Sequence, residues 1–215
     1  MPRYYHSYSD LPKSLPLFPL TGAVLMPRGA LPLNIFEPRY LEMVDYALMG
    51  DRLIGMIQPS EHEDTVLKPK LSLVGCAGKI VSFRETEDNR YLLTLQGICR
   101  FRLTAEMDTT TPWRAGFTDF GAFAGDLAQT PDEDFPRERL LAALKAYLNT
   151  RDMKADWKSV MNAPGEALIN ALAMMCPFDP AEKQALLEAN SFQDRASTLM
   201  ALLEMGGEAG PTTIN

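Results

Sequence analysis

Few side chains in this sequence are of the types that bind metals or transfer protons. There are two histidines, His6 and His62, and the second is flanked by Glu61, Glu63 and Asp64. A histidine among carboxylates could ligate a divalent metal, but adjacent side chains rarely converge on one ion without further ligands. The pattern therefore favours a surface loop at residues 61–64, and no metal site is predicted.

The three cysteines, Cys76, Cys99 and Cys176, are too few and too scattered for a disulfide framework or a zinc site. All three have apolar sequence neighbours. None has a cation or a helix N-terminus nearby in the sequence that would lower its pKa and make it a nucleophile. Buried, reduced thiols are predicted, although neighbours in space could change this.

The sequence does not match the other motifs that commonly mark cation, phosphate or nucleophile sites. The acidic run from Asp132 to Asp134 could hold a cation, but a solvated acidic loop is the favoured interpretation. The Gly78-Lys79 pair has Leu73 where a phosphate loop needs its first glycine, and Ile80 follows the lysine. No Gly-x-Ser-x-Gly elbow occurs. The sequence therefore predicts no catalytic residue and no cofactor.

Composition fits a globular protein of 215 residues with net charge −7. No apolar run is long enough for a transmembrane helix, and the N-terminus does not resemble a signal peptide, so a cytoplasmic protein is expected. Residues 1–120 carry 13 Lys/Arg and 14 Asp/Glu, whereas residues 121–215 carry 8 and 14. Phosphate binding needs surplus cations. Nucleic acid is therefore an unlikely partner, with a local basic patch in the first half left open.

The first part of the chain, residues 1–120, is predicted to be β-rich. Prolines at 16 and 19 indicate an edge strand or an extended entry segment, because proline donates no ladder hydrogen bond. A short strand at 24–26 is followed by a turn at 27–29 and a second strand at 31–36. Pro38 favours a helix start, and Gly50 a helix end. The face of that helix is predicted to carry Leu41, Val44, Tyr46 and Leu48.

A strand at 52–58 and a long hairpin at 71–107 follow, with Asn89 suited to a left-handed turn residue. On the second arm, apolar residues from Tyr91 to Leu103 alternate with polar ones, which predicts one core face and one outer face. Arg100 and Arg102 fall on the outer face, where solvation is favoured over partner contact. Glycines at 75, 78 and 97 could provide bulges that close a small barrel. With a last strand at 113–120, five to seven strands are expected.

After this part, residues 121–136 are predicted to be a linker, residues 137–206 a helical subdomain of about four helices, and residues 207–215 a disordered tail. One apolar stripe holds Leu140, Leu141, Leu144 and Leu148, and another holds Leu168, Ile169, Leu172 and Met175. Asp179 to Glu182 forms a strong helix start, and Ser191 begins another. Strands grouped before helices predict an α+β fold.

From residue 14 to 205 the chain resembles the N-terminal substrate-binding domain of Lon proteases. The resemblance implies a PUA-like β-barrel subdomain with an attached helical subdomain. It also implies a stand-alone form, because the ATPase and the serine–lysine peptidase of the full enzyme have no counterpart here. The motifs that carry it are Leu15-Pro16-Leu17-Phe18-Pro19-Leu20, the segment from Leu31 to Tyr40, Arg52 to Met56, Gly75 to Ile80, Asp88 to Tyr91, Gly97 to Phe101, Lys183 to Glu188 and Arg195 to Leu199.

The resemblance implies a non-catalytic module that recognises unfolded or apolar polypeptide segments, as an adaptor or holdase. A separate full-length protease is a further candidate partner. The alternatives are PUA-like nucleic-acid binding and a specific protein-interaction domain. Methionines 26, 43, 49 and 56 could line a deformable groove, although core filling is favoured. Phe36, Tyr40 and Met43 are the proposed peptide-contact residues. A structural role is expected for Glu37, Pro38, Arg39, Gly55, Gly75, Arg90, Gly97, Arg100 and Phe101, with Glu37 and Arg39 as a charge pair or cap at the strand-to-helix corner.

Overall fold

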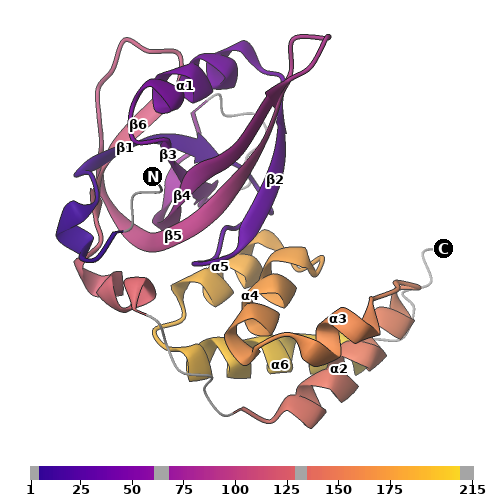
Figure 1. The fold of residues 1–215 in the computed structure, drawn as a ribbon. Coiled ribbons are helices and arrows are strands. Elements are labelled where there is room, and N and C mark those ends of the chain that lie inside the picture. Colours follow the sequence, from indigo (N-terminus) through magenta and orange to yellow (C-terminus); the bar gives the residue numbers. More distant parts are fainter. Residues whose placement is uncertain (1–4, 61–67, 129–134, 209–215) are drawn as a thin grey trace. The chain divides into compact units, whose positions relative to one another are not determined.

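The computed structural model describes residues 5–60, 68–128 and 135–208. The chain divides into two compact units, Met1–Gln129 and Thr130–Asn215 (Figure 1). The first unit holds the described strands and the second holds helices only. The predicted order of a β-rich part followed by a helical part, and with it the α+β class, is confirmed.

Six strands form one mixed sheet in the order β2-β5-β4-β3-β1-β6, and β6 also pairs with β5 (Figure 1). The pairings from β5 through β4, β3, β1 and β6 back to β5 therefore make a closed, barrel-like circuit, with β2 added outside it. The strands are β1 (Ser14–Pro19), β2 (Ala30–Ile35), β3 (Leu53–Pro59), β4 (Leu71–Glu85), β5 (Tyr91–Glu106) and β6 (Arg114–Asp119).

The prediction that the first apolar run is an edge strand or an entry segment was wrong. Strand β1 lies inside the sheet, parallel to β3 and antiparallel to β6. Its prolines are tolerated because the two pairings are staggered. Pro16 pairs with Ala115 of β6 before the β3 pairing begins, and Pro19 pairs with Ile57 of β3 after the β6 pairing has ended. Each proline thus has a neighbouring strand on one side only.

Helix α1 (Pro38–Met49) begins with Pro38 in its first turn and ends at Gly50, as predicted. Its predicted buried face was wrong in part. The buried residues are Tyr40, Met43, Val44 and Ala47, whereas Tyr46 is 55% exposed. The error arises because the predicted buried face starts at Leu41, whereas the face that packs on the core starts one residue earlier, at Tyr40.

The β4–β5 hairpin turns at Asn89, whose φ of 58° confirms the predicted left-handed residue. Glycines at its base allow close packing. A Cβ at Gly97 would lie 2.0 Å from the Met26 carbonyl oxygen, and one at Gly75 would lie 2.5 Å from the Met56 carbonyl oxygen. Gly55 and Gly75 both face the buried Phe101 ring. A Cβ added at Gly55 would lie 3.1 Å from the ring, and one added at Gly75 would lie 2.6 Å from it. The ring of Phe101 therefore occupies space that only glycines leave open.

The predicted linker from residue 121 contains a structured segment. Residues Gly121–Leu127 form the 3-10 helix η2, in which Phe123 and Asp126 are buried. The boundary between the two units, after Gln129, lies within the range 121–136 that was predicted as the linker. A second 3-10 helix, η1, covers Tyr8–Asp10 near the N-terminus. The acidic run 132–134 lies outside the described residues.

The helical unit contains five described helices, one more than the approximate prediction. Asp179 N donates to the Glu182 carboxylate at 2.8 Å, and Ser191 Oγ accepts from Asp194 N at 3.0 Å, so both predicted helix starts are confirmed. The helices are α2 (Arg137–Thr150), α3 (Trp157–Asn162), α4 (Gly165–Met175), α5 (Pro180–Glu188) and α6 (Phe192–Glu208).

Two details of the helical prediction were wrong. Helix α6 continues through Gly206 and Gly207 to Glu208, because these glycines allow close packing on α2. A Cβ at Gly206 would lie 2.7 Å from the Tyr147 ring. The rest of the predicted tail lies outside the described residues. Met175, placed on a buried stripe, is 77% exposed.

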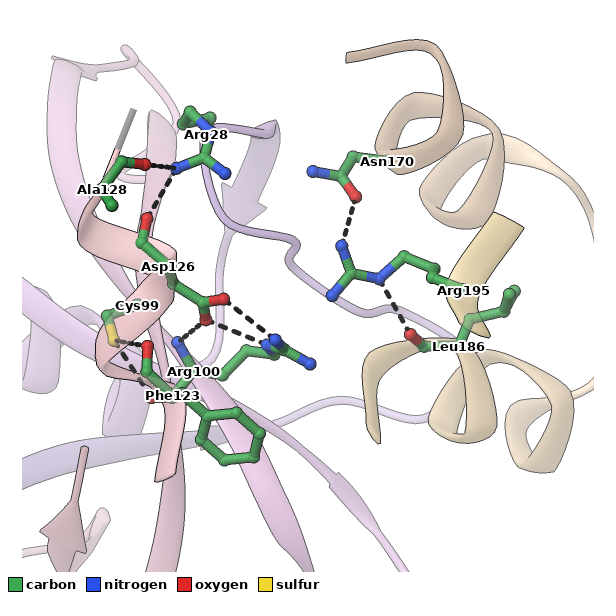
Figure 2. A network of polar contacts seen from close by, with 9 residues as sticks. All are labelled: Arg28, Cys99, Arg100, Phe123, Asp126, Ala128, Asn170, Leu186 and Arg195. Carbon is green, nitrogen blue, oxygen red and sulfur yellow. Dashed lines mark hydrogen bonds and ion pairs between the residues drawn. The ribbon is translucent and has the colours of Figure 1, made fainter. Parts of the chain in front are cut away.

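Cations from other elements bind the carbonyl ends of several helices. Arg137 donates to three carbonyls at the end of α3, at 2.8–3.0 Å. Lys183 Nζ donates to Met174 O of α4. Arg195 Nε donates to Leu186 O of α5, as Figure 2 shows. Arg151 donates to Gly206 O of α6. These contacts satisfy carbonyls that have no partner within their own helix.

Candidate functional site

Of the three predicted peptide-contact residues, only Phe36 is exposed. It directly follows β2 and is 62% exposed, with the Arg90 guanidinium 5.8 Å from its ring centroid. Phe83, 40% exposed, stacks edge-on against Tyr91 with ring centroids 4.9 Å apart. We call Phe36, Phe83, Arg90 and Tyr91 the hairpin-tip surface, since the strand register places them around the end of the β4–β5 hairpin.

The structure places Tyr40 and Met43 in the core rather than on a surface, at 7% and 0% exposure. Tyr40 packs edge-on against Phe18 with centroids 4.5 Å apart, and burial raises the pKa of its hydroxyl. Neither side chain can reach a partner in this conformation. Met26 and Met56 are buried too, so of the four methionines near this segment only Met49, 82% exposed, is on a surface.

Glu37 and Arg39 form a surface ion pair at 2.7 Å, with side chains 43% and 47% exposed. Glu37 occupies the N-cap position of α1 without a side-chain bond to the helix. The arginine stacks over the Tyr40 ring at 4.5 Å. The pair therefore lies at the strand-to-helix corner, while the alternative cap role is not seen.

The prediction that Arg100 lies on a solvated outer face was wrong. It is 5% exposed and pairs with the buried Asp126 of η2, and its guanidinium lies 4.5 Å from the Phe123 ring centroid (Figure 2). Arg28 Nη1 donates to Asp126 O at 2.6 Å from the turn at residues 27–29. Because η2 covers this part of β5, the arginine has an internal partner and is not available to a ligand.

A mainly apolar groove is present in the helical unit, and the sequence prediction did not find it. We call it the α2–α4 groove. It encloses about 340 Å³, near the lower end of the roughly 300–1,000 Å³ range of ligand pockets. Its lining residues are Leu144, Leu148, Met153, Lys154, Ala155, Asp156, Ser159, Val160, Ala163, Ala167, Leu168, Ala171, Leu172, Met175 and Cys176.

The lining divides into a buried part and an exposed part. Leu144, Leu168 and Leu172 are buried, whereas Met153 and Met175 are 39% and 77% exposed. Ala167 and Ala171 of α4 and Ala163 before it add small side chains to the lining, between the larger ones. The sequence signal was the high apolar content of α4, in which Glu166 and Asn170 are the polar side chains.

Two polar groups in the lining have different surroundings. Asp156 caps α3, accepting from the backbone N of Lys158 and Ser159 and from Ser159 Oγ. These bonds, the Ser159 hydroxyl first, lower the pKa of the Asp156 carboxyl, so it is ionised at neutral pH. Lys154 is exposed and belongs to the loop between α2 and α3. The groove can therefore bind apolar side chains and leaves charges at its margin.

The histidines and cysteines that the sequence offered for chemistry lie apart from one another or buried in the part of the chain that the structure describes. Among the described residues, no three His, Cys, Asp or Glu side chains lie together so as to hold a metal ion. His6 is exposed near η1, and His62 lies outside the described residues. All three cysteines are free and buried, and burial raises the pKa of each thiol, to about 12 for Cys99 and about 11 for Cys176. Protonated buried thiols are weak nucleophiles.

Within the parts of the chain that the structure covers, we found no helix with the length and apolar character needed to cross a membrane.

Comparison with curated proteins gives Lon proteases that are several times longer. Lon protease of Desulfosudis oleivorans is 31% identical over 105 residues, which are 48% of this chain and 13% of that protein. Lon protease of Flavobacterium johnsoniae is 24% identical over 198 residues, covering 87% of this chain and 23% of that protein. The chain thus spans between about an eighth and a quarter of the length of these two relatives.

Solved structures share the fold. The Lon N-terminal domain protein from Xanthomonas campestris has a TM-score of 0.60 and 24% identity, covering 87% of this chain and 97% of that one. The N-terminal domain of Mycobacterium avium complex Lon protease has a TM-score of 0.58 and 13% identity, covering 92% and 99%. The family model described as the ATP-dependent protease La (LON) substrate-binding domain matches residues 14–205. The chain therefore belongs to the Lon substrate-binding domain family.

Proposed function

We propose that this protein captures apolar segments of unfolded polypeptides and does not cleave them, as an adaptor or holdase. The observation that carries the proposal is the α2–α4 groove, an apolar channel with exposed methionines at its margin. Methionine side chains are unbranched and polarizable, so they adapt to apolar side chains of different shape. Family membership supports the same role, because the family is described by substrate binding.

The size of the groove suits a short segment. At about 340 Å³ it can take a few aliphatic or aromatic side chains but not a folded domain. Capture of this kind requires that the partner expose apolar side chains, which unfolded chains do and native proteins mostly do not. The hairpin-tip surface, which includes Phe36 and belongs to the other unit, is proposed as a secondary contact region.

Anisotropy of a fluorescent, permanently unfolded protein tests the proposal, with labelled RNA of similar mass in parallel. We expect saturable binding of the unfolded chain and none of the RNA. Ala171→Trp fills the groove, and we expect it to weaken binding at least about tenfold. Ala142→Trp is the matched control, because Ala142 is exposed on α2 outside the lining. RNA binding alone, or equal binding by both variants, would count against capture in the groove.

The partner protein and the cellular location are proposed from fewer observations than the capture of apolar segments. Because the family description refers to a protease, we propose that captured segments are passed to a separate full-length Lon protease. Adding the chain to such a protease should then accelerate degradation of the unfolded protein, and an unchanged rate would contradict the transfer. Three free thiols fit a reducing compartment such as the cytoplasm. Fluorescence microscopy of the tagged chain in cells would show whether it is there.

A further inference from the structure

Two methionines in the lining of the α2–α4 groove are open to solvent. Met175, the last residue of α4, is 77% exposed, and Met153, in the loop between α2 and α3, is 39% exposed. Both belong to the lining. Oxidants convert a thioether sulfur that they can reach into a sulfoxide. An oxidant in solution therefore has access to two side chains that a captured segment would contact.

The methionines of the core are shielded from the same oxidant. Met26, Met43 and Met56 of the first unit are at most 1% exposed, and Met200 of α6 is 8% exposed. Sulfoxides disturb a protein core when they form inside it. Brief oxidation of this chain would therefore change the margin of the groove and leave the packing of both cores in place.

The groove also contains a thiol, and its surroundings make it unreactive. Cys176 belongs to the lining but is 4% exposed. Burial raises the pKa of its thiol to about 11, so the thiol is protonated at neutral pH. Because peroxides react with the thiolate, Cys176 is a poor target. The oxidisable groups of the groove are thus its two exposed methionines.

We propose that Met153 and Met175 are oxidation sites through which peroxides weaken the capture of apolar segments. This inference rests on the proposed function and adds its regulation. Hydrogen peroxide transfers one oxygen atom to the thioether sulfur. The O–O bond breaks, an S–O bond forms, the sulfur loses two electrons, and the second oxygen leaves as water.

The product changes what the groove can bind. A sulfoxide is polar, and its oxygen loses hydrogen bonds to water when an apolar side chain packs against it. The deformable apolar surface that methionine offers to varied segments is lost at the same time. Methionine sulfoxide reductases reverse the oxidation, so the effect on capture is expected to be reversible.

Brief treatment of the full chain with hydrogen peroxide tests the inference. Mass spectrometry of proteolytic peptides identifies the methionines that have gained an oxygen atom, and anisotropy measures binding of the fluorescent unfolded protein before and after. We expect oxidation at Met153 and Met175 to weaken binding about tenfold. Methionine sulfoxide reductases that act on both epimers should restore the affinity.

Paired leucine variants assign the effect to the groove. Met153→Leu with Met175→Leu keeps apolar side chains of similar volume that peroxide does not oxidise, so its affinity should stay within about twofold after treatment. Met161→Leu with Met205→Leu is the matched control. These two methionines are 63% and 68% exposed on α3 and α6 and lie outside the lining, so the control should lose affinity as the parent does.

A polar variant tests the same step without an oxidant. Met153→Gln with Met175→Gln places an amide where the sulfoxide would be, and both positions are exposed enough to accept it. We expect binding about tenfold weaker than that of the untreated parent, with an unchanged melting temperature. Unchanged binding by this variant would show that polarity at the margin does not control capture.

The outcomes separate the two proposals. If the untreated parent does not bind the unfolded protein, the proposed function fails and this inference fails with it. If the untreated parent binds, and binding is equal or tighter once both methionines are oxidised, only the inference is overturned. An equal loss of affinity in the Met153→Leu, Met175→Leu variant would likewise overturn the assignment to these two residues.

Discussion

Asp126 and Arg100 are joined by three hydrogen bonds of 2.9 Å. The Asp126 Oδ2 atom accepts from both the backbone N and the Nε of Arg100, and Oδ1 accepts from Nη2. Both side chains are at most 10% exposed. The pair fixes η2 to β5 just before the chain leaves the first unit.

Replacing one member of this pair leaves the other charged and buried. We expect Asp126→Ala to lower the free energy of unfolding by about 3–5 kcal/mol. Urea denaturation followed by tryptophan fluorescence measures it. The double variant Arg100→Met with Asp126→Leu should be clearly more stable than Asp126→Ala, because it removes both charges. A loss below about 1 kcal/mol for Asp126→Ala would show that the pair contributes little.

Strand β2 pairs only with β5 among the described strands, so one of its edges is free. The bond from Gly97 N to Gly29 O and the register Leu31↔Leu95 direct the amides of residues 31, 33 and 35 toward β5. Residues 30, 32 and 34 therefore face the free edge. The missing N–H of Pro32 lies there, in the middle of the strand, and interrupts a row of donors that another chain could use.

Restoring a backbone N–H at position 32 should promote self-association of the chain. We expect Pro32→Val to form dimers or larger species at concentrations where the parent chain does not, as measured by light scattering after size exclusion. Leu31→Val is the control, because it also introduces a β-branched residue but its amide already faces β5. Unchanged mass for Pro32→Val would mean that the edge is protected in another way.

Gly97 lies so close to the turn at residues 27–29 that a side chain cannot be accommodated. The Cβ of Gly97→Ala would meet the Met26 carbonyl oxygen at 2.0 Å, and a backbone atom cannot rotate away. We expect a loss of about 3 kcal/mol or more in the free energy of unfolding. Gly125→Ala should lie within about 0.5 kcal/mol of the parent, because no atom lies within 4 Å of that Cβ. Similar effects of the two changes would contradict the close contact.

The buried thiols predict a loss of stability in alkali. Burial raises the pKa of the Cys99 thiol from 9.0 to about 12, so the native state retains a proton that the unfolded chain releases. The stabilisation is fully present below the unfolded pKa of 9.0 and is lost as the pH rises toward 12. Between pH values near 8 and near 10, the parent should lose about 1.4 kcal/mol more than Cys99→Ala. Equal losses in denaturant titrations at the two pH values would contradict the raised pKa.

Local signals in the sequence predicted much of the fold. Some signals depend only on neighbours within four residues, so the sequence alone is enough to predict them. Examples are Pro38 at a helix start, Asn89 in a turn and the Asp179–Glu182 cap. The burial of Arg100 depends on Asp126, 26 positions away, and alternation along one strand cannot show it. The error of one residue in the face of α1 placed Tyr46 in the core, and the proposed methionine-lined groove led to Tyr40 and Met43 as contact residues, which the structure buries.

The α2–α4 groove escaped prediction for a related reason. Its lining comes from α2, α3, α4 and the loop between the first two, so no single periodic pattern contains it. Only the excess apolar character of α4 was visible in advance. Phe36 stays a prediction as a contact residue, since exposure allows the contact but does not demonstrate it.

The cations that bind helix ends have a consequence for how the second unit unfolds. Arg137 of α2 holds the end of α3, Lys183 of α5 holds the end of α4, and Arg195 of α6 holds the end of α5. Detaching α2, α5 or α6 exposes a neighbour's terminal carbonyls, so partial opening carries a cost beyond lost packing. Amide hydrogen exchange across α2 to α6 should therefore report one shared opening free energy, with the helices released together.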